Sequence, residues 1–253
     1  MNKEERHMFI VKQLEVHDKV LVMDLANVLN VTPETIRRDL AELEMNEQLT
    51  RIHGGAVPFI PTQREMIYEK KMSLYLEEKK RIAKRAAELI QHGDTIALDL
   101  GTTTVHIADM IEDVQSLTVV TNSLSAAIRF NLALEERRIS GQVIMLPGIT
   151  NPYQASVKGT ATVEFLKRFN FTRAFISCGG FTTNAIYDFD MDESLVSETM
   201  IQCSKESILL ADASKFNKRS NFKICPLSNI STVICNEEKP VEWDEQKSAW
   251  IMA

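Results

Sequence analysis

The chain has 253 residues, of which 44% are hydrophobic and 25% charged, and its formal net charge at pH 7 is −6. This length suffices for one large domain or for a small domain followed by a medium one, and the composition is ordinary for a globular protein. The longest apolar runs are far too short to span a membrane, and the N-terminus has no signal-peptide core, so we expect a cytoplasmic protein without a membrane partner.

The four cysteines and five histidines show no spacing typical of metal ligands. The cysteines are far apart in the chain and form no C-x-x-C pair. In a reducing compartment such cysteines usually behave as small buried hydrophobic residues. The sequence therefore predicts no metal site, and no motif in it implies a cofactor.

The first 57 residues contain three helical patterns. Residues 3–15 form the first predicted helix, a short second helix covers about residues 23–29, and the third begins after Thr32 and ends near residue 46. The Thr32 side chain can accept hydrogen bonds from the free amides of the next turn, and Pro33 suits the first helical position. This is a helix-turn-helix pattern, whose second helix would enter a DNA major groove.

The third helix has one apolar face, because Ile36, Leu40 and Leu43 recur at i, i+4 and i+7. After it, residues 48–57 combine β-compatible residues with Gly54-Gly55. Alone this glycine pair suits a plain surface turn, but directly after a recognition helix it indicates the hairpin of a wing. The candidate DNA-contacting residues are Thr32, Glu34, Thr35, Arg37 and Arg38 on the helix and Arg51 and His53 in the wing.

Residues 1–57 carry seven basic and ten acidic residues, a net charge of −3. A DNA-binding domain is usually basic overall, so positive charge here must act locally, on the recognition helix and the wing. We expect modest non-specific DNA affinity and a dependence on the avidity of a homo-oligomer, a dimer or a tetramer.

Three segments in this region are diagnostic together: Asp24-Leu25-Ala26, then Val31-Thr32-x-x-Thr35-Ile36-Arg37-Arg38-Asp39-Leu40-x-x-Leu43, and then Arg51-x-His53-Gly54-Gly55-Ala56. They are similar to the N-terminal signature of the DeoR family of bacterial transcriptional regulators. This resemblance implies a winged helix-turn-helix domain that binds double-stranded operator DNA.

Residues 58–78 change in character, with Pro58 and Pro61 followed by a charged, methionine-rich stretch. We predict a linker that enters a helix. Two interpretations fit this stretch equally well: Met66, Ile67 and Met72 pack between domains or subunits, or the linker is solvated. The predicted domains are therefore residues 1–57, a linker at 58–78, and an effector-binding and oligomerisation domain at 79–253.

From residue 79 onward, helical patterns alternate with short apolar strands. Near-continuous apolar strands that alternate with helices predict a mostly parallel α/β sheet covered on both faces. The predicted strands lie at 95–100, 117–121, 142–146, 173–178, 207–211 and 231–235, and the predicted helices at 79–91, 104–111, 123–134, 160–168 and 193–205.

Five polar or glycine-rich loops follow predicted strands, where open α/β sheets bind ligands, so we predict one shared pocket. The glycine and the hydroxyls of the loop at 99–104 suit a phosphate, although helix capping by its threonines explains these residues equally well. The loop matches neither a Walker loop nor a dinucleotide fingerprint. Lys215 can face a bound anion, although a surface charge is as plausible. The candidate ligand residues are Asp99, Gly101, Thr102, Thr103, Thr104, Thr121, Asn122, Ser123, Gly148, Gly179, Gly180 and Lys215.

These loops also resemble the C-terminal sensor domain of the DeoR family, through Leu98-Asp99-x-Gly101-Thr102-Thr103-Thr104, Thr121-Asn122-Ser123, Gly179-Gly180 and Asp212-x-Ser214-Lys215-Phe216. The resemblance implies a fold similar to ribose-5-phosphate isomerase and a phosphorylated sugar as effector. Two departures bear on the ligand: residues 184–193 are more acidic and aromatic than the family pattern, and Ser197 stands where a lysine is common.

The sequence is consistent with three functions. The leading hypothesis is a repressor of a sugar-catabolism operon, in which a phosphate bound at 101–104 together with Lys215 changes subunit packing and the linker passes this change to the recognition helices. An isomerase would instead use Asp99, Asp188 and Lys215, but the loop at 177–180 lacks the acidic residues of related isomerases. An activator is the third, because no residue determines the sign of regulation.

Overall fold

The computed structural model describes residues 3–17, 19–45, 48–52, 54–58, 66–243 and 248–253. Contacts between residues divide the chain into two compact units, Met1–Arg64 and Glu65–Ala253. The predicted linker ran to residue 78, whereas the helix α4 (Tyr68–Ser73) and the residues after it belong to the second unit. Within the described residues, no helix combines the length and the apolar character needed to cross a bilayer.

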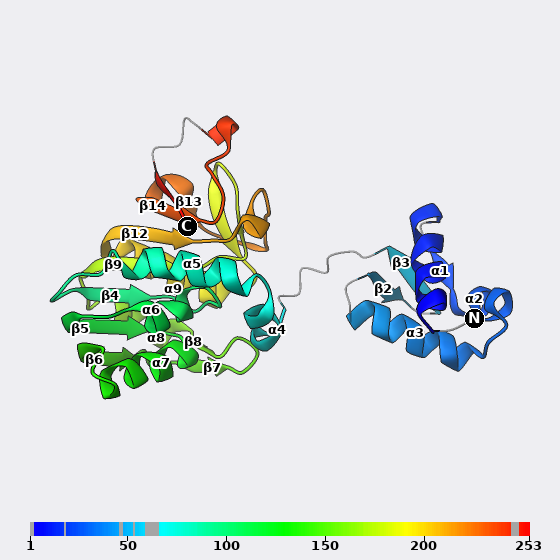
Figure 1. Cartoon of the computed structure of the whole chain (residues 1–253), viewed down its shortest axis with the longest axis horizontal. Coiled ribbons are helices and arrows are strands. Elements are labelled where there is room, and N and C mark those ends of the chain that lie inside the picture. The colour runs from blue at the N-terminus through cyan, green and yellow to red at the C-terminus, as the bar shows by residue number, and fades with distance from the viewer. Residues whose placement is uncertain (1–2, 18, 46–47, 53, 59–65, 244–247) are drawn as a thin grey trace. The chain divides into compact units, whose positions relative to one another are not determined.

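The first unit packs three helices against a small antiparallel sheet (Figure 1). The sheet has the order β1-β3-β2, and the hairpin of β2 and β3 is the predicted wing. Its core contains the apolar face predicted for the third helix, with Ile36, Leu40 and Leu43 fully buried. The elements are α1 (Lys3–Val16), β1 (Val20–Leu21), α2 (Val22–Leu29), α3 (Pro33–Met45), β2 (Leu49–Ile52) and β3 (Gly55–Pro58).

A seven-stranded sheet forms the centre of the second unit, and every neighbouring pair of its strands is parallel. This confirms the predicted α/β class. The inner strands are apolar and largely buried because helices cover both faces, whereas the two edge strands are partly exposed. In spatial order they are β15 (Ala249–Met252), β14 (Thr232–Cys235), β12 (Ser204–Leu210), β9 (Phe171–Ile176), β4 (Thr95–Leu98), β5 (Val114–Thr121) and β6 (Ile139–Met145).

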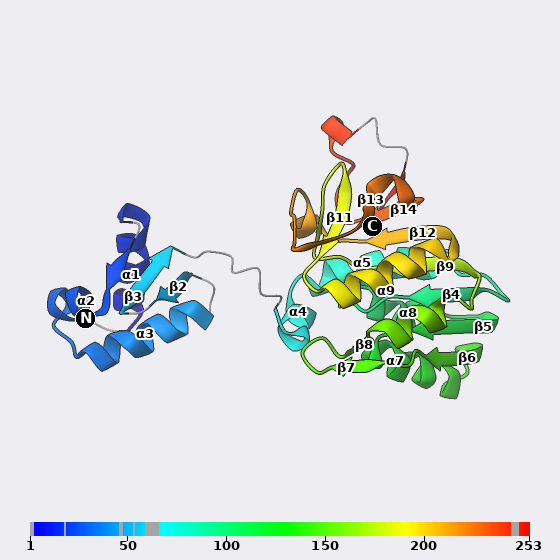
Figure 2. The ribbon, with the colours of Figure 1, turned by 180° about the vertical axis from the view of Figure 1, so that it is seen from behind.

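Two hydrophobic cores lie on the two faces of this sheet. One contains Ile82, Phe130 and their neighbours from α5, α6 and α7; the other contains Leu166, Met200 and their neighbours from α8 and α9. Figure 1 is viewed from the side of α5 and α6, and Figure 2 from the side of α8 and α9. These helices are α5 (Leu76–Ala87), α6 (Ile107–Met110), α7 (Leu124–Glu135), α8 (Thr160–Leu166) and α9 (Met191–Gln202).

The structure adds short elements that the sequence did not predict. They have only two to five residues each, which gives too little periodicity to recognise. The predicted helix at 104–111 is also shorter, a 3-10 turn η1 (Thr104–His106) followed by the single turn of α6. The added elements are the hairpin β7 (Ile149–Asn151) and β8 (Ser156–Lys158), a sheet of β10 (Gly180–Phe181), β11 (Ala185–Asp188) and β13 (Phe222–Pro226), the edge strand β15, and the 3-10 turns η2 (Ala213–Lys215), η3 (Leu227–Asn229) and η4 (Val241–Trp243).

Candidate nucleic-acid interface and ligand pocket

The start of α3 is capped as its sequence predicts. The Thr32 hydroxyl oxygen accepts a hydrogen bond from the amide of Thr35 at 3.3 Å and lies 2.9 Å from the Thr35 hydroxyl. α3 then begins at Pro33. The cap holds the first turn of α3, the part of a recognition helix that approaches base edges.

Beyond this cap, α3 presents two arginines to solvent. The Arg37 guanidinium donates to a Glu34 carboxylate oxygen at 2.6 Å, and these two side chains are 57% and 77% exposed. An ion pair this exposed contributes little stability, so a DNA phosphate or base can replace Glu34 as the partner of Arg37. Arg38 is exposed on the same helix. In the free protein, the hydrogen bond to Glu34 orients the Arg37 side chain.

The wing is joined to α3 through Arg51. Its backbone amide donates to one carboxylate oxygen of Glu44 at 2.9 Å and its side-chain Nε to the other at 2.7 Å. Arg37, Glu44 and Arg51 also line a groove between α3 and the wing. The pair places Arg51 beside the recognition helix, as a wing contact requires. The candidate His53 lies outside the described residues.

An ion pair between α1 and α3 was not predicted. The Asp39 carboxylate is buried and accepts from Arg6 Nε at 2.7 Å and from Arg6 Nη2 at 3.0 Å, with His7 Nε2 3.2 Å away. Burial opposes ionisation of Asp39, but the hydrogen bonds and charge of Arg6 outweigh it and hold the pKa of Asp39 below its ordinary value. The sequence carried one signal for it, since Asp39 falls between Ile36 and Leu43 on the apolar face.

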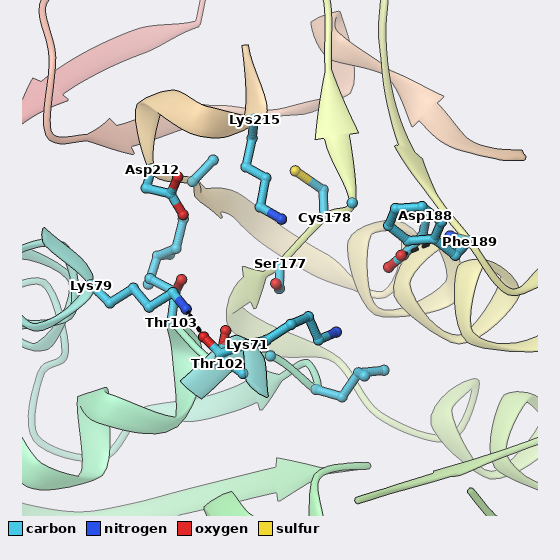
Figure 3. Close-up of a pocket in the computed structure, with 15 residues that line it drawn as sticks. Lys71, Lys79, Thr102, Thr103, Ser177, Cys178, Asp188, Phe189, Asp212 and Lys215 are labelled. Carbon is cyan, nitrogen blue, oxygen red and sulfur yellow. Dashed lines mark hydrogen bonds between the residues drawn. The ribbon is translucent and has the colours of Figure 1, made fainter. Parts of the chain in front are cut away.

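The second unit has a pocket at the carboxyl ends of β4, β9 and β12, which are neighbours in the sheet (Figure 3). This is the position at which open α/β sheets bind ligands. Five of the predicted residues line it: Gly101, Thr102, Thr103, Gly179 and Lys215. The other lining residues are Lys71, Lys79, Leu100, Ser177, Cys178, Asp188, Phe189, Leu210, Ala211 and Asp212.

Three lysines line this pocket from three different segments. Lys215 comes from η2, Lys79 from α5 and Lys71 from α4 (Figure 3). The Lys79 ammonium is buried and donates a hydrogen bond to the backbone carbonyl of Lys71. Burial lowers the pKa of Lys79 to about 8; the charges of Lys215 and Lys71 add to this effect, while that of Asp212 opposes it. A bound anion would relieve this repulsion between cations.

Sequence reasoning missed Lys71 and Lys79. Lys79 precedes Ile82 and Ala83 by three and four residues, so it lies on the buried face of α5. A lysine within an apolar face is a signal for a buried functional charge, because lysine is almost never fully buried without a partner. Lys71 gave no comparable signal, since its segment was predicted to be a linker.

Asp99 and Thr104 were predicted to contact ligand but do not line the pocket. Asp99 is buried beneath the loop, where its carboxylate accepts from the Leu100 amide at 2.8 Å and lies 2.8 Å from the Ser197 hydroxyl. Burial raises the pKa of Asp99 well above its ordinary value. The Thr104 hydroxyl donates to the Asp99 carbonyl at 2.8 Å. Both side chains thus stabilise the loop at 99–104 through hydrogen bonds to its backbone.

Gly101 is required by packing as well as by its place in the pocket. A Cβ atom at this position would lie 2.5 Å from the Cβ and Oγ atoms of Ser177, closer than such atoms approach in proteins. The loops after β4 and β9 can therefore meet only if residue 101 is glycine.

The predicted loops at 121–123 and 147–148 lie outside the residues that line the pocket, which corrects the expectation that all five loops share it. Gly180 does not line the pocket either, although the rest of its loop, at 177–179, does. The Thr121 hydroxyl donates to the Leu98 carbonyl at 2.7 Å, Ser123 caps α7 through the Ala126 amide, and the carbonyl of Asn122 accepts from the Val157 amide. The Thr121 and Ser123 side chains are thus bonded within the fold, whereas the Asn122 side-chain atoms Oδ1 and Nδ2 are buried and have no hydrogen-bond partner among the described residues. Neither Gly148 nor Gly180 has room for a side chain: a Cβ atom would lie 2.3 Å from the Thr162 hydroxyl oxygen at Gly148 and 2.6 Å from the Lys218 carbonyl oxygen at Gly180.

A winged helix-turn-helix unit followed by an α/β unit with a pocket at its strand ends defines a DNA-binding protein with a separate sensor-type domain. Residues 6–60 match the model of the DeoR-like helix-turn-helix domain, and residues 75–237 match that of the DeoR C-terminal sensor domain. The chain belongs to the DeoR family of transcriptional regulators.

Similar proteins include two from Staphylococcus epidermidis. An uncharacterized HTH-type transcriptional regulator is 46% identical over 84% of both chains, and a lactose phosphotransferase system repressor is 34% identical over 92% of both. Among solved structures, ribose 5-phosphate isomerase A from Neisseria gonorrhoeae shares 13% identity over 61% of this chain and 57% of its own, with a TM-score of 0.39. The relatives in sequence are transcriptional regulators, and the chain is a regulator of the same family.

Proposed function

We propose that this protein is a cytoplasmic repressor of a sugar-catabolism operon, and that a phosphorylated sugar bound in the pocket of the second unit weakens its binding to operator DNA. The observation that carries this proposal is the convergence of Lys71, Lys79 and Lys215 on one pocket that Thr102 and Thr103 also line. Lysine ammonium groups bind phosphate as point charges, and the threonine hydroxyls add donors and acceptors. The lactose phosphotransferase system repressor among its relatives supports both the repression and the sugar chemistry.

Operator recognition is assigned to α3 and the wing. Arg37 and Arg38 contact bases or phosphates, Thr32, Glu34 and Thr35 lie beside the groove, and Arg51 reaches the backbone from the wing. One arginine in a bidentate pair with guanine gives about 1–3 kcal/mol of discrimination. Because the net charge of the first unit is negative, useful affinity requires two such units in a homo-oligomer.

The experiment is a gel shift of DNA from upstream of the neighbouring operon, titrated with the full-length protein. Four sugar phosphates are then added to the protein–DNA complex, and each is compared with its free sugar: glucose 6-phosphate, fructose 1-phosphate, fructose 6-phosphate and ribose 5-phosphate. We expect at least one sugar phosphate to release the DNA and its free sugar to have no effect. Lys215→Met should abolish this response, whereas Lys84→Met, which removes an exposed lysine of α5, should retain it. DNA binding that no sugar phosphate changes would overturn the proposed effector.

A further inference from the structure

The helix α4 is the first described element after the DNA-binding unit, and it also reaches the ligand pocket. Only residues 59–65 separate Pro58, at the end of β3, from Met66. Five residues after Met66, Lys71 lines the pocket. The same short segment therefore adjoins the DNA-binding unit in the chain and contributes a cation to the ligand site.

The N-terminal end of α4 is fastened to the hairpin of β7 and β8. The Tyr68 amide donates to the Tyr153 carbonyl at 2.8 Å, and the Gln154 side chain donates to the Met66 carbonyl at 3.0 Å. The Tyr68 side chain is buried. These contacts are at the N-terminal end of α4 and involve none of the three pocket lysines. They can therefore persist whether the pocket is occupied or empty.

The C-terminal end of α4 lies beside the pocket and contacts α5 there through a hydrogen bond. The Lys79 ammonium donates to the Lys71 carbonyl (Figure 3). Met72, the next residue along α4, packs against the core. Beyond them, Leu74 and Tyr75 are 38% and 53% exposed, and Tyr75 has a φ of +52°, in the left-handed region that residues other than glycine seldom adopt. The junction between α4 and α5 is thus exposed and conformationally strained, and Lys79 spans it.

We infer that α4 is a strap that the effector fastens: an anion bound between Lys71, Lys79 and Lys215 joins α4 to α5 and η2. Without the anion, three lysines and two aspartates, Asp188 and Asp212, line the pocket, so the cations exceed the carboxylates by one. Asp212 attracts Lys79, while the charges of Lys215 and Lys71 repel it and work against the contact between the Lys71 segment and Lys79. With the anion, the ammonium groups share a common counter-charge, and charge-assisted hydrogen bonds hold the C-terminal end of α4. Occupancy of the pocket is thereby passed to the segment that leads to the DNA-binding unit. This inference rests on the proposed function.

The test is amide hydrogen exchange of the full-length protein with and without inorganic phosphate, at constant ionic strength. Phosphate should slow exchange in peptides covering residues 66–75 by about fivefold, the factor that corresponds to about 1 kcal/mol. Lys71→Met should remove this slowing. Lys70→Met is the matched control, because it removes the same charge from the exposed neighbouring position of α4, and Lys71→Arg keeps the charge in place; both should respond as the wild type does.

Thermal shift measured on the same samples separates this inference from the proposed function. If phosphate or a sugar phosphate raises the melting temperature but leaves exchange at 66–75 unchanged, or slows it equally in Lys71→Met, then the strap is wrong and the binding site stands. If neither phosphate nor any sugar phosphate raises the melting temperature, the binding site is wrong and the strap is wrong with it. Slowing that depends on residue 71, together with a thermal shift, supports both.

Discussion

Lys79→Met should stabilise the ligand-free second unit and abolish its response to ligand. In the folded protein the pKa of Lys79 falls from 10.5 to about 8, chiefly because of burial. At about 1.4 kcal/mol for each tenfold change in the ionisation equilibrium, a charged Lys79 costs the folded state roughly 3 kcal/mol. Methionine cannot donate to the Lys71 carbonyl, which offsets about 1 kcal/mol. We therefore expect the free energy of unfolding to rise by about 2 kcal/mol.

The same shift predicts the pH dependence. Between about pH 8 and pH 10.5, the unfolded chain keeps the Lys79 proton while the folded chain has released it. Stability therefore rises with pH across this window, because the unfolded state binds more protons. Lys79→Met should lose this rise, and a sugar phosphate that raises the pKa of Lys79 should reduce it in the wild type.

Urea unfolding followed by tryptophan fluorescence measures the second unit alone, because both tryptophans, Trp243 and Trp250, lie in it. For a unit of this size, about 2 kcal/mol raises the melting temperature by roughly 4–8 °C. Lys84→Met should stay within about 0.5 kcal/mol of wild type and keep the full ligand response. A Lys79→Met protein that is less stable than wild type, or that still releases operator DNA with a sugar phosphate, would refute the reasoning.

Three further predictions concern single residues. Arg37→Ala and Arg38→Ala should weaken operator binding in a gel shift, by about 1–3 kcal/mol for an arginine that pairs with guanine, without changing tryptophan-monitored unfolding; intact affinity in both would overturn the assignment of α3. Asp39→Asn leaves the largely buried Arg6 without its carboxylate and should destabilise the first unit by about 2–4 kcal/mol, which far-UV circular dichroism detects and tryptophan fluorescence does not; coincident transitions in both signals would contradict it. Asp99→Asn should remove the fall in stability that the raised pKa of Asp99 produces as pH increases above 3.8, measured by urea unfolding against pH, and an undiminished fall would show that another group causes it.

The sequence determined the local elements and the class of the fold. The spacing of Ile36, Leu40 and Leu43 fixes which face of α3 is buried, and Thr32-Pro33 fixes where the helix starts. In the second unit, runs such as Thr95–Leu98 are so apolar that only a sheet covered on both faces accommodates them. These features depend on residues that are close in the chain, and so a single sequence reveals them.

Only the tertiary structure decided which strand-end loops share a pocket. The order of strands in the sheet brings together the loops after β4, β9 and β12, whereas the hydroxyls of Thr121 and Ser123 form hydrogen bonds within the protein. It also decided that Lys71 and Lys79 face the same space as Lys215, about 140 residues further along the chain. Helical periodicity marks the buried face of a segment but carries no information about the distant residue that the face will meet. For that reason the sequence predicted a pocket at the strand ends and did not reveal two of the three lysines that line it.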